Sequence, residues 1–141
     1  MSSTGEVKAS PLSVAIDPYR SRLATDSRDF TVALLALAKS NANGTSSFNA
    51  PSAQDGAALH ALAHWRRDAQ HALRRVRSVE PQASGRKLAE RWLKTLIAAL
   101  DLQRQALSLA SPDLAAAAAG SARQKIAEYH RLGARLDRVL A

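Results

Sequence analysis

Apolar side chains recur every three or four residues along three long stretches of the chain, 52–79, 81–110 and 112–140. This spacing places the apolar residues of each stretch on one side of an α-helix. Proline separates the stretches, and proline ends or restarts a helix. The pattern therefore predicts three long amphipathic helices joined by short connections.

A fourth, earlier helix is predicted to begin at Asp17, because Asp17-Pro18 resembles an N-cap followed by proline at the first helical position. We expect it to end near Ser40, before the turn-rich segment 41–51. Residues 1–16 are small, polar and unpatterned, which predicts a flexible tail followed by one helical domain at 17–141. The apolar residues of this helix are Tyr19, Leu23, Phe30, Leu34 and Leu37.

Four helices with short connections favour an all-α fold, a four-helix antiparallel up-and-down bundle. The apolar band of the third helix covers nearly half its surface, which predicts contact with more than one neighbour. A second architecture fits the pattern as well: three long helices in an antiparallel coiled coil with a loosely attached first helix. The last helix carries a heptad seam typical of coiled coils, formed by Ala118, Ala122, Lys125, Tyr129, Leu132, Leu136 and Val139.

Composition narrows the class of protein. The 141 residues include no cysteine, which excludes thiolate nucleophiles and cysteine-ligated metals. No apolar run approaches the ~20 residues that span a bilayer. The first residues lack the pattern of a secretory signal, so we expect a cytoplasmic protein, with export independent of such a signal left open.

Basic residues concentrate around the junction of the second and third predicted helices, in a chain whose formal net charge is +8. Cations at the C-terminal end of a helix stabilise its dipole, which is one reason for them to be there. The other interpretation is a patch that binds polyanions such as nucleic acid or polyphosphate. The residues assigned to this candidate patch are Arg66, Arg67, Arg74, Arg75, Arg77, Arg86 and Lys87.

The second helix also carries His60, His64, Asp68 and His71 at separations close to whole turns. Imidazoles and carboxylates are metal ligands, so these four residues are a candidate metal site. Their face lies away from the apolar stripe, where we expect water around them and nearby arginines opposing a cation. We therefore predict no cofactor and keep this site as the weaker alternative.

Motifs of known enzymes are missing from the sequence: there is no Gly-x-Ser-x-Gly elbow, no glycine-rich phosphate loop and no Glu-x-x-His pair. Nor is there the Trp-x-Gly turn of the small helical hairpins that bacterial secretion systems export. We expect a non-catalytic bacterial protein that acts by protein–protein association, as an adaptor, scaffold or secretion-related component. The association surface is predicted on the third and fourth helices, with a protein partner or a second copy; polyanion binding is the alternative.

Overall fold

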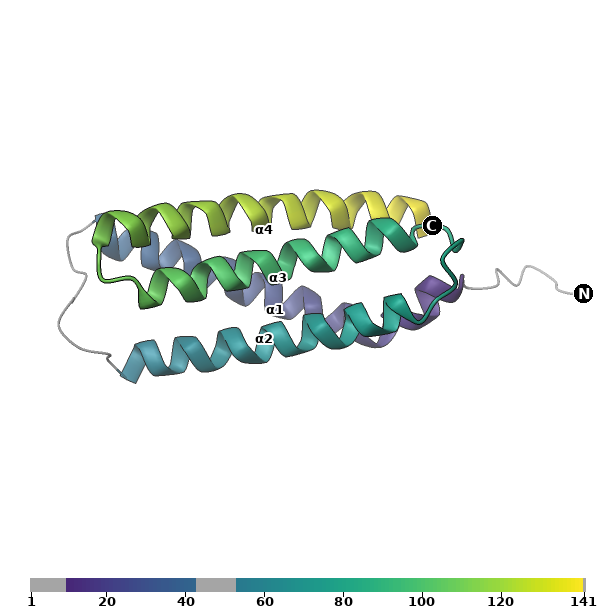
Figure 1. The fold of residues 1–141 in the computed structure, drawn as a ribbon, viewed down its shortest axis with the longest axis horizontal. Coiled ribbons are helices and arrows are strands. Elements are labelled where there is room, and N and C mark those ends of the chain that lie inside the picture. The colour runs from purple at the N-terminus through teal and green to yellow at the C-terminus, as the bar shows by residue number, and fades with distance from the viewer. Residues whose placement is uncertain (1–9, 43–52, 141) are drawn as a thin grey trace, which may run out of the picture.

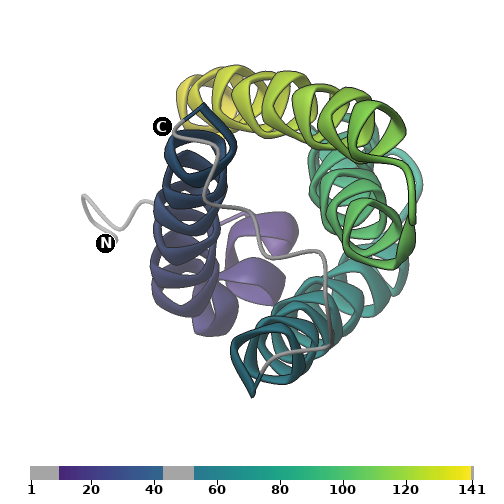
Figure 2. The same ribbon diagram turned by 90° about the vertical axis from the view of Figure 1, so that its left-hand side faces the viewer.

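The computed structural model describes residues 10–42 and 53–140, and all regular structure within them is helical. Figure 1 shows that each helix reverses the direction of the one before, and Figure 2 shows them arranged in a ring in chain order. The predicted antiparallel four-helix bundle is therefore confirmed. The helices are α1 (Pro11–Ala42), α2 (Ala53–Arg77), α3 (Arg86–Ser108) and α4 (Pro112–Leu140). Most of the predicted turn segment 41–51 lies outside the described residues.

The apolar stripes of all four helices meet in one core. α3 packs against both α2 and α4, as its wide apolar band predicts, and its contact with α4 is the most extensive in the bundle. The contact between α1 and α4 is the least extensive of the four neighbouring pairs. Within the described residues, no helix is both long and apolar enough to cross a membrane. The most deeply buried large side chains are Leu12, Ile16, Leu23, Phe30, Leu34, Val76, Leu93, Leu96, Leu100 and Leu136.

The first helix begins at Pro11, so the predicted start at Asp17 and the predicted tail boundary at residue 16 are wrong. The combination of a cap and a following proline occurs twice, and the earlier copy is the real start. The Ser10 hydroxyl accepts a hydrogen bond from the Ser13 amide at 3.1 Å. Proline inside a helix removes one backbone hydrogen bond, but the helix continues through Pro18. Burial of Leu12 and Ile16 in the core offsets this loss.

Four predicted seam positions of α4 are buried, Ala122, Tyr129, Leu132 and Leu136. The Lys125 side chain is exposed, with its ammonium 3.7 Å from the Glu128 carboxylate. Ile126, one residue later, is buried in its place. Val139, at the end of the predicted seam, is 48% exposed. The buried residues of α4 from Ala119 to Leu136 therefore stay three or four positions apart, as in a heptad seam, on a line that passes through Ile126 and not through Lys125.

A stacked aromatic pair joins α3 to α4. The rings of Trp92 and Tyr129 are nearly parallel, with centroids 5.1 Å apart. Gly133, one turn after Tyr129, leaves room for the indole: a Cβ at this position would lie 2.9 Å from Trp92 Nε1. The missing side chain of Gly133 thus permits the close approach of the two helices.

Replacing Gly133 by alanine is expected to lower the free energy of unfolding by about 1–3 kcal/mol, because the added methyl group overpacks the contact with the rigid indole. Gly120→Ala in the same helix is the matched control. Its Cβ meets only the Arg123 guanidinium at 3.7 Å, so helix propensity should raise stability by about 0.5–1 kcal/mol. Urea unfolding followed by circular dichroism measures the stability of both variants. If Gly133→Ala were as stable as Gly120→Ala, the close approach of α3 and α4 at Gly133 would be contradicted.

Candidate functional site

A shallow groove runs along the surface between α2 and α3. It consists of two hollows, of about 970 and 460 Å³, that adjoin at Arg66 and Gln70. Apolar side chains from both helices, including Leu62, Leu73 and Ile97, contribute to its walls. We call it the α2–α3 groove; the cations that line it are Arg66, Arg67, Arg74, Arg77, Lys94 and Arg104.

Positive charge dominates the α2–α3 groove. Asp101 is the carboxylate among its lining residues, and its oxygen is 2.8 Å from Arg66 Nε. Lys94 lies 3.3 Å from Glu90. Among the residues that the structure describes, the other four groove cations form no ion pair: Arg67, Arg74, Arg77 and Arg104.

The structure separates the predicted polyanion residues into three groups. Arg66, Arg67, Arg74 and Arg77 line the groove. Arg75 is exposed but is not among the groove residues. The remaining two, Arg86 and Lys87, lie beyond the end of α2, at the start of α3.

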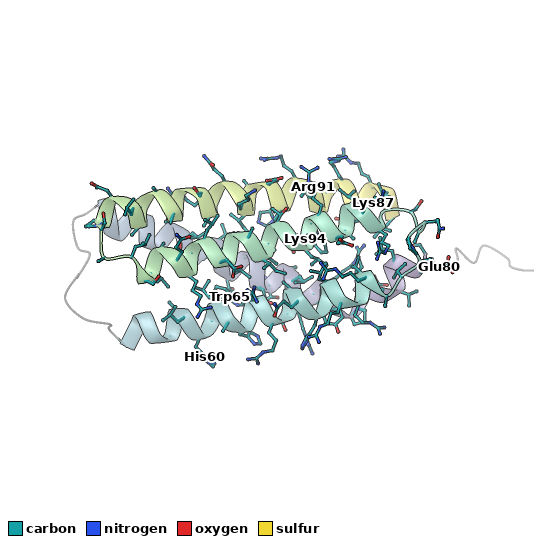
Figure 3. All side chains as sticks on the ribbon, in the orientation of Figure 1. His60, Trp65, Glu80, Lys87, Arg91 and Lys94 are labelled. Atoms are coloured by element: carbon teal, nitrogen blue, oxygen red, sulfur yellow. The ribbon has the colours of Figure 1, made fainter. Side chains whose placement is uncertain are left out.

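Arg86 has a structural role at the turn between α2 and α3. It donates hydrogen bonds to the carbonyl oxygens of Val79, at 3.0 Å, and Arg77, at 3.2 Å. These bonds satisfy acceptors left unpaired where α2 ends. Lys87 lines a further hollow together with Arg91 and Lys94, and this hollow adjoins the groove at Lys94. Figure 3 shows these three side chains along α3.

Sequence reasoning missed Lys94 and Arg104 as groove residues. Both belong to the polar face of α3, ten residues apart, which is close to three helical turns. The spacing was visible in the sequence. The missing information was that this face borders the basic side of α2 across a shared groove.

The predicted cluster on α2 is only partly exposed to water. His60 and His64 are exposed, and Figure 3 shows His60 on the outer side of α2. Asp68, however, is only 6% exposed, so the expectation that it faces water is wrong. The reason is that α1 covers this flank of α2 and buries Asp26, also 6% exposed, beside it.

Asp26 and Asp68 form, with His64, a compact set of donor atoms. The His64 Nε2 atom is 3.6 Å from Asp68 Oδ2, and one donor atom from each of the three residues lies within 4.8 Å of the others. His60 and His71 do not belong to this set. The Asp26 Oδ2 atom is buried and has no hydrogen-bond partner among the described residues. Asp26 was not a predicted site residue.

Burial raises the pKa of Asp26 from 3.8 to about 7, chiefly because the charged carboxylate loses its hydration. The neighbouring Asp68 adds to the rise through a hydrogen bond to the protonated acid and through its charge. Asp29 also raises this pKa and Arg22 lowers it. Burial, followed by the charge of Asp26, raises the pKa of Tyr129 on α4 as well.

Comparison of the chain with protein-family models, curated proteins and solved structures gave no match. The groove and the carboxyl pair are therefore interpreted from their own geometry.

Replacing Asp26 by asparagine is expected to stabilise the protein above pH 7 and to have little effect near pH 4. The folded protein holds the Asp26 proton up to about pH 7, whereas the unfolded chain releases it near 3.8. Between these values the unfolded state binds fewer protons, so the stability of the unaltered protein falls as pH rises. Once Asp26 is charged in the unaltered protein, the free energy of unfolding of the Asp26→Asn variant should be about 1–3 kcal/mol higher than that of the unaltered protein.

The measurement is urea unfolding from pH 4 to pH 8 in the presence of a chelator. Asp29→Asn is the control, because Asp29 is exposed on the same helix and should show no comparable pH-dependent difference. If the gain in free energy of unfolding of Asp26→Asn were the same at every pH in this range, the raised pKa of Asp26 would be contradicted.

Proposed function

We propose that the protein binds a polyanion, either nucleic acid or polyphosphate, along the α2–α3 groove. The observation that supports this proposal is the excess of unpaired cations over carboxylates among the groove residues. Arginine predominates there, and its planar guanidinium forms paired hydrogen bonds with phosphate oxygens. The proposed role is one of binding and not of catalysis.

The groove has the shape for an extended ligand. From Leu59 to Arg77, which lie at opposite ends of its α2 side, the helix rises about 27 Å. A phosphate polymer lying along it would meet several cations in succession. Each neutralised phosphate releases counterions, so the affinity of such a complex falls steeply with salt.

Binding of the phosphate backbone, without contacts to the bases, is consistent with the burial of the aromatic side chains that the structure describes. Trp92, Phe30 and Tyr129 are buried in the core, and Tyr19 and Trp65 are partly buried against it. Stacking of single-stranded bases needs exposed aromatic rings. We therefore propose binding that is independent of base sequence.

Association with a protein partner or a second copy stays a prediction. The two features that motivated it are used inside the bundle, because the apolar band of α3 and the seam of α4 pack mainly against each other and the core. A cytoplasmic location, which would bring the groove into contact with nucleic acid and polyphosphate, also stays a prediction.

Changing Arg67, Arg74 and Arg77 together to glutamate is expected to weaken binding by about tenfold or more at low salt. The matched control changes Arg131, Arg135 and Arg138, exposed cations on α4, to glutamate and so alters net charge equally. Fluorescence anisotropy with a labelled DNA duplex, a single strand and polyphosphate, each over a series of salt concentrations, gives affinity and salt dependence. For duplex DNA, a plot of log affinity against log salt has a negative slope, and its magnitude should decrease by about 2–3 in the groove variant.

Three outcomes would reject the groove as a polyanion site. One is absence of binding to all three probes at low salt, and another is binding that does not change with salt. The third is an equal loss in both triple variants, which would assign the affinity to net charge alone.

A further inference from the structure

We propose that Asp26, His64 and Asp68 bind one divalent transition-metal ion between α1 and α2. This site is separate from the groove and does not depend on the polyanion proposal. It differs from the candidate seen in the sequence, because it takes one donor from α1 and omits His60 and His71.

The donor set has suitable chemistry and spacing. One imidazole and two carboxylates are ligands for zinc and for related ions such as cobalt and manganese. Ligands about 2.0–2.2 Å from a tetrahedral metal ion lie roughly 3.3–3.6 Å from each other. The 3.6 Å separation of His64 Nε2 and Asp68 Oδ2 is close to this range, and the Asp26 donor lies within 4.8 Å.

Independent support comes from the unpartnered oxygen of Asp26. A buried polar atom without a hydrogen bond is unfavourable, and two adjacent carboxylates add electrostatic repulsion. When both carboxylates are charged, Asp26 Oδ2 is such an atom, because Asp68 beside it offers no donor; the side chain is directed toward Asp68 and His64. A divalent cation would satisfy this oxygen and neutralise both carboxylates.

The surroundings allow an ion to reach the site. The side chain of His64 is 59% exposed, so one side of the cluster is open to solvent, whereas the carboxylates lie within the contact between α1 and α2. The other charged groups that influence Asp26 are Asp29 and Arg22 on α1, and Asp26 in turn influences Tyr129 on α4. Asp29 favours a cation there and Arg22 opposes it.

Metal binding requires deprotonated carboxylates and a neutral imidazole. The affinity should therefore increase as pH rises from 6 to 8, with proton release on binding.

Calorimetric titration of the full chain with Zn²⁺ at pH 7.5 tests the proposal. The unaltered protein should take up one equivalent, and Asp26→Asn and His64→Ala should each bind about tenfold more weakly or worse. His60→Ala is the matched control, because His60 is an exposed histidine one turn from His64, and it should bind normally. Co²⁺ in place of Zn²⁺ should give visible absorption bands of a four-coordinate ion that are lost in Asp26→Asn.

His60 and His64 alone could form a surface metal pair, because they are one helical turn apart. In that case His60→Ala would abolish binding and Asp26→Asn would keep it, and this result would overturn the proposal. Absence of Zn²⁺ and Co²⁺ uptake by the unaltered protein would overturn it too. Circular dichroism of Asp26→Asn, whose helical content should be unchanged, separates loss of the site from loss of the fold.

Discussion

Each of the four helices carries an apolar stripe, and the need to remove all four stripes from water determines how the bundle is arranged. α3 has the widest band and makes the two most extensive helix contacts, with α4 and with α2. Its contact with α4 is made close by Gly133, where a side chain would collide with Trp92. The pairing of helices then decides which flanks of each helix are covered by protein and which remain in water.

This pairing gives α2 two flanks of opposite electrostatic character. On the side covered by α1, Asp68 meets Asp26 in a dehydrated contact. On the side facing α3, arginines border a groove that is open to water. Two carboxyl groups thus lie inside the contact with α1, while arginines dominate the opposite flank of α2. The flank that faces α1 is suited to a cation, whereas the flank that faces α3 is suited to an anion.

The sequence was sufficient to predict the helices and the bundle because 3.6-residue periodicity reports directly on burial. It failed at Pro18, where the choice between two cap-and-proline signals depended on the burial of Leu12 and Ile16. These residues extend the spacing of Tyr19 and Leu23 backward along the helix, so the pattern contained the correct answer.

The candidate sites were less predictable because they lie between helices. Asp68 is about 40° around the helix from Ala72, a core residue, and thus at the border of the apolar stripe. Periodicity alone does not say whether a neighbour covers this border. Asp26 lies three residues after Leu23 and four before Phe30, so it is on the buried face of α1. Because it is charged, it was not included among the apolar residues of that face. Lys94 and Arg104 likewise line the groove only because α2 lies beside α3.

The ring order of the helices has a consequence for how the chain folds. Neighbours along the chain are also the main neighbours in space, and topologies dominated by such local contacts fold rapidly. We expect the α3–α4 hairpin, with the largest contact and a connection of residues 109–111, to form the folding nucleus. α1 makes the least extensive contact with α4, so we expect it to dock last. On this expectation, Asp26 and Asp68 come together at the final step of assembly.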